Sequence, residues 1–162
     1  MNEYDLTLKL IYWVLILLRP ALIYVMYGVL GDQHSPASEQ VIVYTIMSIA
    51  TVDGILSYFL YKKLDNPEKL GSGFFSKMNR GHGLPDEAIH WTEEDLKNYR
   101  KDHAIVNISI ISWALGFAVG IFGIMIPLVG GTQTEGLALI LMSLGLGLYQ
   151  KPKENLFNAR NK

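Results

Sequence analysis

The sequence predicts an all-α integral membrane protein with four transmembrane helices, arranged as two tandem antiparallel hairpins with a cytoplasmic helical loop between the second and third spans. Two observations predict this fold class. First, 50% of the 162 residues are apolar and 18% are charged, which excludes a disordered chain. Second, residues 62–103 hold 16 of the 29 Asp, Glu, Lys and Arg residues. Three long segments hold almost none: 10–30, 41–61 and 104–129.

A membrane-spanning helix needs about 20 apolar residues, and three segments meet this length. Leu10–Leu30 and Val41–Tyr61 match it, whereas Ala104–Val129 is longer, so the third helix begins in the membrane interface or is tilted. The fourth predicted span, Leu137–Tyr149, is short and is expected to recruit residues 132–136 in order to cross. Polar connectors that contain Gly, Ser or Pro join the spans of each pair, as expected of tight hairpins.

Two other interpretations of the apolar segments fit the sequence less well. A soluble four-helix bundle needs a polar face on every helix, and the runs VLILL (14–18) and IFGIMIPLV (121–129) have none. A cleaved signal peptide begins with basic residues, whereas this chain begins with the acidic stretch MNEYD, and no small-residue cleavage site follows the first apolar run. The first span is therefore expected to remain in the mature protein.

The basic residues predict the orientation of the chain. Thirteen of the 14 Lys and Arg residues lie on one predicted side, and the fourteenth is Arg19 inside the first span. The positive-inside rule then places both termini and the 62–103 loop in the cytoplasm of a bacterial-type inner membrane, or on the matrix side in an organelle. The predicted organisation is a first hairpin (1–63), a cytoplasmic loop whose helix leads into the third span (64–103), a second hairpin (104–150) and a cytoplasmic tail (151–162).

Two dipeptides suggest an internal repeat. Tyr27-Gly28 recurs as Phe122-Gly123, and Met47-Ser48 recurs as Met142-Ser143, both with an offset of 95 residues. Gly28 and Gly123 each lie near the outer end of the first helix of a predicted hairpin. Either a duplicated hairpin or chance within an apolar alphabet explains these matches.

The pattern of spans resembles that of the proteolipid c-type subunits of rotary ATPases, which are small tandem hairpins with a carboxylate inside the membrane. The carboxylate in this chain is Asp53, in the second span. The resemblance is one of architecture, because the dense alternating glycines of such subunits are missing from the first span and the repeat counterpart of Asp53 is Leu148. It implies an ion-carrying role for Asp53.

Arg19 and Asp53 are the two charged residues inside the apolar segments 10–30 and 41–61. An ionised residue at the bilayer centre costs about 2.5–3.5 kcal/mol. At a rise of 1.5 Å per residue, Arg19 lies about 13–14 Å and Asp53 about 12 Å from the cytoplasmic ends of their spans. We therefore predict an intramembrane ion pair, with Ser57 one turn from Asp53 as a further hydrogen-bond donor. The pair either fixes the register of the hairpin or marks Asp53 as a protonatable group on an ion path, and an ion pair between neighbouring subunits is a third alternative.

Small residues predict how the third and fourth spans pack. Steps of three or four residues place them on one face of each helix, and small residues allow helices to approach closely in lipid. The residues are Ser109, Ser112, Gly116, Gly120 and Gly123 in the third span and Gly136, Ser143 and Gly147 in the fourth. Either the two faces pack together or one is left for another subunit. Ala138 and Gly145, on the opposite side of the fourth span, favour an oligomer or a complex.

The cytoplasmic loop has two parts. Its first part places Leu70, Phe74, Phe75 and Met78 among basic residues. This part either rests on a membrane surface, docks on a protein, or is an ordered loop that covers the helix ends. Its second part begins a helix, because Thr92 and Asp95 form a capping box and acidic residues fill the first turn. This helix is expected to run from Glu93 without interruption into the third span.

The sequence predicts no enzyme activity, no metal and no cofactor. His82, His90 and His103 lack the spacing of metal ligands and are expected to be solvated loop residues. No nucleic-acid or small-molecule partner is evident, and the expected partners are the lipid bilayer and other membrane subunits or copies of the chain. The predicted function is therefore a non-catalytic multi-pass subunit of a larger inner-membrane complex or homo-oligomer. The alternative is an ion- or proton-translocating proteolipid or small channel subunit that uses Asp53.

Overall fold

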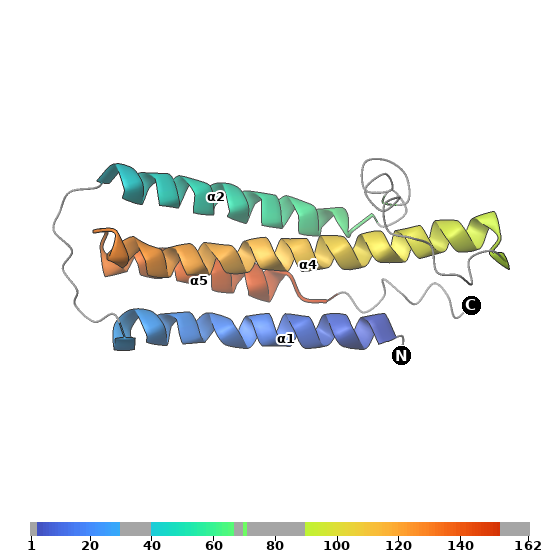
Figure 1. Cartoon of the computed structure of the whole chain (residues 1–162), viewed down its shortest axis with the longest axis horizontal. Coiled ribbons are helices and arrows are strands. Elements are labelled where there is room, and N and C mark those ends of the chain that lie inside the picture. Colours follow the sequence, from blue (N-terminus) through green and yellow to red (C-terminus); the bar gives the residue numbers. More distant parts are fainter. Residues whose placement is uncertain (1–2, 30–39, 67–69, 71–89, 153–162) are drawn as a thin grey trace.

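The computed structural model of the chain describes residues 3–29, 40–66, 70 and 90–152, and the elements in these ranges are all helical. They are α1 (Glu3–Tyr24), a short π-helical continuation η1 (Val25–Val29), α2 (Gln40–Lys63), α4 (Glu93–Leu128) and α5 (Gln133–Tyr149). Successive helices run in opposite directions along one long axis (Figure 1). The all-α class predicted from the sequence is confirmed.

Within the described ranges, three helices are long and apolar enough to cross a membrane: Leu6–Gly28, which covers most of α1 and η1, then α2, and α4. Helix α5 has 17 residues, which extend about 25 Å, whereas a bilayer's hydrocarbon core is about 30 Å thick. The fourth span therefore stays a prediction. Many large apolar side chains on α1 and α2 are exposed, for example Leu17 (69%) and Val41 (77%), as lipid-facing surfaces require.

Helices α4 and α5 begin in the same way. The Thr92 hydroxyl accepts a hydrogen bond from the Asp95 N–H (3.2 Å), and the Asp95 carboxylate accepts one from the Thr92 N–H (3.1 Å). Thr132 and Glu135 form the same capping box in front of α5. These reciprocal bonds satisfy N–H groups that have no partner within a helix. Helix α4 begins at Glu93, as predicted, and its N-terminal part extends beyond the other helices (Figure 1).

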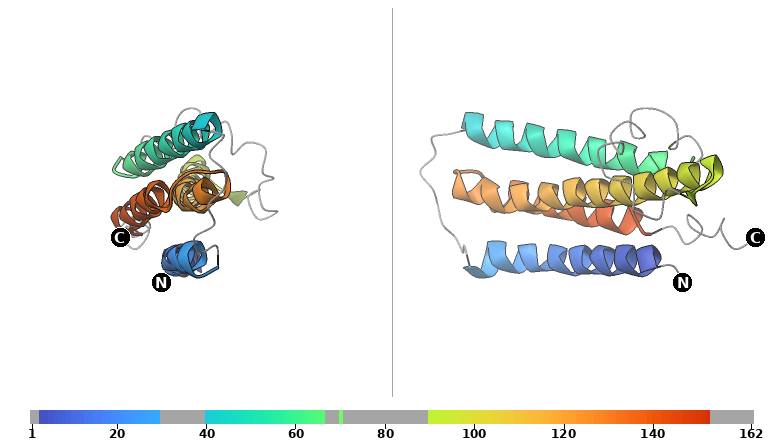
Figure 2. Two further views of the ribbon diagram at one scale, coloured as in Figure 1. Left: turned by 90° about the vertical axis from the view of Figure 1, so that its left-hand side faces the viewer. Right: turned by 45° about the vertical axis from the view of Figure 1, so that its right-hand side comes forward.

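The arrangement of the helices differs from two tandem hairpins. Helices α4 and α5 form a central pair, α2 lies on one side of this pair and α1 lies on the other (Figures 1 and 2). The predicted first hairpin (1–63) is therefore not a pair of packed neighbours. Glycines lie at the contacts between the central pair and both outer helices. A Cβ on Gly120 of α4 would lie 2.7 Å from Leu22 of α1, and Gly54 of α2 faces Val119 of α4.

The positions that suggested an internal repeat have different environments. Gly28 is exposed, whereas Gly123 is buried where the backbones of α4 and α5 approach each other. Ser48 is exposed on the outer face of α2, whereas Ser143 is buried and donates a hydrogen bond to the Gly116 carbonyl (2.7 Å). The structure gives no support to two equivalent hairpins.

Three apolar clusters lie along the bundle. One cluster lies at the C-terminal end of α2, joins that helix to α4 and includes Leu70. A second cluster lies toward the N-terminal end of α2 and joins α2, α4 and α5. The third joins α1 to α4 through Leu8, Tyr12 and Trp113. The described core therefore consists of separate apolar contacts, and a polar region lies between them around the end of α5.

Candidate functional site

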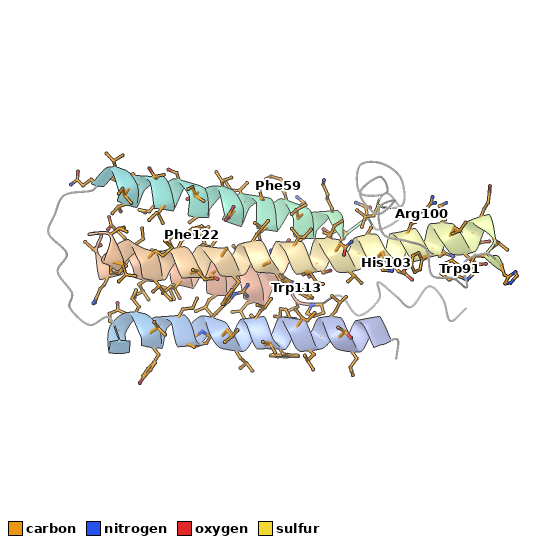
Figure 3. The ribbon with its side chains drawn as sticks, in the orientation of Figure 1. Phe59, Trp91, Arg100, His103, Trp113 and Phe122 are labelled. Atoms are coloured by element: carbon orange, nitrogen blue, oxygen red, sulfur yellow. The ribbon has the colours of Figure 1, made fainter. Side chains whose placement is uncertain are left out.

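The most polar part of the described interior surrounds the C-terminal end of α5. A helix leaves its last carbonyls without partners inside the helix. Three aromatic side chains from three other helices donate hydrogen bonds to carbonyls here. They are Tyr12 of α1, Trp113 of α4 and Tyr61 of α2, and their acceptors are the carbonyls of Gly147 (3.1 Å), Gln150 (2.8 Å) and Lys151, respectively. The end of α5 therefore accepts a hydrogen bond from each of α1, α2 and α4. Figure 3 shows Trp113 on the side of α4 that faces α1.

A chain of hydrogen bonds continues from the Gln150 side chain into α2 and α4. Gln150 Nε2 donates to Ser57 Oγ (2.7 Å), and Ser57 Oγ donates to the Ser112 carbonyl (2.7 Å). All three residues are fully buried. We refer to one set of side chains as the α5-end cluster: Tyr12, Arg19, Ser57, Tyr61, Trp113 and Gln150.

Arg19 is the charged member of the α5-end cluster, and its exposed fraction is 1%. Its guanidinium lies against Gly147 of α5, where a Cβ would overlap it. Its Nη2 lies 3.4 Å, and Oε1 of Gln150 lies 3.3 Å, from the position that a Cβ on Gly116 would occupy. Among the described residues, Arg19 Nη2, Arg19 Nε and Gln150 Oε1 have no hydrogen-bond partner. Because the C-terminal end of a helix carries a negative partial charge, Arg19 faces the negative end of α5.

Asp53 lies outside the α5-end cluster, at the edge of the outer face of α2. It is half-buried, and its neighbours on the outer face are exposed aliphatic residues. Val52 is 54% and Leu56 is 48% exposed, whereas Gly54 on the other side is buried against α4 and α5. The described residues supply no ion-pair partner to Asp53.

The ion pair predicted from the sequence does not form in the described part of the chain. Arg19 and Asp53 have similar depths, but they belong to helices that lie on opposite sides of the α4–α5 pair (Figure 2). The prediction assumed that helices consecutive in the sequence are neighbours in space. Ser57 also has a different role, because it bonds to Gln150 and Ser112.

The predicted small residues of α4 and α5 are all buried. The closest approach joins Gly123 to Gly136, where a Cβ on Gly123 would lie 2.6 Å from the Gly136 carbonyl oxygen. Ser143 donates a hydrogen bond to the Gly116 carbonyl, and Gly147 faces Arg19 of α1. Ser109 and Ser112 donate hydrogen bonds to carbonyls of α4 itself. On the opposite side of α5, Ala138 is exposed and a Cβ on Gly145 would meet no atom within 4 Å.

Sequence reasoning missed four members of the α5-end cluster: Tyr12, Tyr61, Trp113 and Gln150. Tyr and Trp in an apolar span are commonly interfacial anchors, so their residue types did not indicate an internal role. Gln150 directly follows the short fourth span. The shortness of α5 is the signal that was present, since a helix that ends within the bundle needs donors for its last carbonyls.

The predicted loop features lie mostly outside the described residues, including His82, Phe74, Phe75 and Met78. Leu70 is described and is buried against α2 and α4. At the extended end of α4, the ring of Tyr99 packs against the rings of Trp91 and His103, with centroid separations of 5.0 Å and 4.3 Å. Trp91 and His103 are labelled in Figure 3. His90 is exposed near the start of this helix. In the described ranges, no three His, Cys, Asp or Glu side chains are grouped to hold a metal ion.

Comparisons with known proteins found no matching protein family, no similar curated protein and no similar solved structure.

Proposed function

We propose that the protein is a non-catalytic, multi-pass membrane subunit, a structural or assembly component of a larger inner-membrane complex or homo-oligomer. Its apolar helices are compatible with a membrane protein. The observation that carries the proposal is Asp53, a half-buried carboxylate beside the exposed aliphatic surface of a candidate span. An ionised residue there costs about 2.5–3.5 kcal/mol, and contact with another chain removes part of that cost.

The α5-end cluster supports a structural role for the chain itself. Hydrogen bonds from Tyr12, Tyr61 and Trp113 join all four helices at one level, and Arg19 is buried among them. Hydrogen bonds between helices of this kind contribute to how the helices pack in a membrane. A bundle joined in this way presents its outer surfaces to neighbouring chains. Both termini and the 62–103 loop are proposed to be cytoplasmic.

A second candidate function, ion or proton translocation by Asp53, is favoured by the same residue. Asp53 is not paired with Arg19 and is half-buried at the outer edge of α2, so within the described residues no salt bridge holds its charge. Intramembrane carboxylates are commonly part of ion pathways.

Asp53→Asn separates the two functions. The amide keeps the shape and hydrogen-bonding ability of the side chain but cannot exchange a proton. The assembly function predicts that the variant keeps much of the native complex, whereas Asp53→Leu dissociates it, as measured by native mass in lipid nanodiscs. The translocation function predicts a fully assembled Asn variant that has lost ion flux in proteoliposomes. If both variants assemble and behave like the wild type, Asp53 carries neither function.

A further inference from the structure

We propose that the Asp53 face of α2 docks a transmembrane helix of a different protein, and that this helix carries a Lys or Arg at the depth of Asp53. The Asp53 face consists of Ile49, Val52, Asp53 and Leu56. The proposal rests on the proposed function in one respect, namely that the chain is inserted in a membrane as part of an assembly. It goes further by naming the chemistry of the partner.

The spacing of the Asp53 face matches a helix-packing surface. Its residues occupy positions i, i+3, i+4 and i+7, which lie along one side of an α-helix. The three aliphatic members, Ile49, Val52 and Leu56, are 47%, 54% and 48% exposed, so no described part of the chain covers them. A single carboxylate surrounded by aliphatic side chains complements an apolar helix with a single cation.

A second copy of the chain does not supply that cation. Arg19 is the one basic residue deep within the candidate spans, and its exposed fraction is 1% because it lies in the α5-end cluster. Lys9, Lys62 and Lys63 lie toward the ends of their spans. A symmetric contact between two Asp53 faces would bring two carboxylates together, which is unfavourable while they are ionised. Charge complementarity therefore points to a different chain.

The depth of the partner residue follows from helix geometry. Asp53 precedes Lys63, the last residue of α2, by ten residues, or about 15 Å along the axis. The partner's Lys or Arg therefore lies about 15 Å from the same end of the membrane span. A lone cation at that depth is itself costly, and pairing with Asp53 relieves both charges together.

A designed helix provides the test. A Leu/Ala peptide of about 23 residues spans palmitoyl-oleoyl-phosphatidylcholine vesicles and carries one Lys at the depth of Asp53. Energy transfer to a dye on Thr134→Cys, in this cysteine-free chain, measures binding to the full-length protein. We expect the Lys peptide to bind about tenfold more tightly than the same peptide with Leu.

Matched variants identify Asp53 as the cause. Asp53→Asn is expected to abolish the difference between the Lys and Leu peptides. Glu94→Gln makes the same change in net charge on an exposed residue in the first turn of α4, and should leave the difference intact. A charge exchange, in which Asp53→Lys meets a peptide carrying Asp, should restore binding.

The outcomes distinguish this proposal from the proposed function. Equal binding of the Lys and Leu peptides overturns the cationic partner. Self-association of the wild type that Asp53→Leu abolishes makes a second copy the occupant, which overturns the different partner but keeps the assembly function. A chain that neither self-associates nor binds any peptide contradicts both.

Discussion

At the scale of single residues, the two charges deep within the first two candidate spans, Arg19 and Asp53, have separate surroundings. Arg19 is buried against the C-terminal end of α5, whose negative partial charge partly compensates the guanidinium. Asp53 lies at the edge of the outer face of α2 and has no ion-pair partner among the described residues. One residue therefore belongs to the internal structure of the bundle and the other to its surface.

A double-mutant cycle measures this separation. Residues that are not in contact and share no partners have additive effects, so the coupling between Arg19→Met and Asp53→Asn should be below about 0.5 kcal/mol. The measurement is the free energy of unfolding in mixed micelles. Breaking one side of a buried ion pair costs about 3–5 kcal/mol, so a coupling of that size would restore the ion pair predicted from the sequence.

Gln150 offers a second test at this scale. Gln150 Oε1 and Arg19 Nη2 are both buried without a hydrogen-bond partner among the described residues, and both lie beside Gly116. Gln150→Glu places a carboxylate near the guanidinium, and a charge-assisted hydrogen bond contributes about 1.5–3 kcal/mol. We expect this variant to be more stable to thermal unfolding than the wild type, although a carboxylate cannot donate the hydrogen bond that Gln150 Nε2 gives to Ser57. Gln150→Leu should be less stable.

The Arg19 background is the control for this prediction. In an Arg19→Met chain, Gln150→Glu buries a carboxylate without a cation and should become destabilising. A Glu substitution that stabilises both backgrounds equally would show that the guanidinium is not the cause.

At the scale of helices, the sequence was informative about local structure and less so about spatial order. The capping boxes at Thr92 and Thr132 fix the starts of α4 and α5, and small residues at helical spacing indicate the α4–α5 contact. No comparable signal places α1. Its side chains near the central pair include Tyr12 and Leu22, which look like lipid-facing residues in the sequence. The separation of α1 from α2 therefore could not be derived from hydropathy and loop length.

Two glycines of α5 give a matched comparison of packing. Gly136 touches the Gly123 carbonyl of α4, so Gly136→Ala forces the two backbones apart and should cost about 1–3 kcal/mol. Gly145 has open space around its Cβ position, and Gly145→Ala should stabilise the helix by up to about 1 kcal/mol. Unfolding of both variants in detergent micelles is the measurement. Equal effects of the two substitutions would contradict the close α4–α5 approach.

At the scale of the whole molecule, apolar side chains lie on the outer faces and hydrogen-bonded polar groups lie inside, which is the distribution that a bilayer favours. The outer faces of α1 and α2 are rich in exposed aliphatic and aromatic side chains, whereas the α5-end cluster is enclosed by all four helices. In lipid, hydrogen bonds and close packing take over the role that hydrophobic burial has in water. The N-terminal part of α4 extends past the other helices and carries most of its charged residues (Figure 1).

The topology of α4 provides a direct test of membrane insertion. Asn98 lies in the extended N-terminal part of α4. Thr134 lies in the first turn of α5, which follows the C-terminal end of α4. Both residues are exposed. In a chain without cysteines, Asn98→Cys and Thr134→Cys each provide one site for a membrane-impermeant maleimide. Because the basic residues flank the Asn98 side, we expect labelling of Thr134→Cys from outside intact cells and labelling of Asn98→Cys only after lysis. The reverse pattern would invert the orientation, and labelling of both sites from outside would mean that α4 does not cross the membrane.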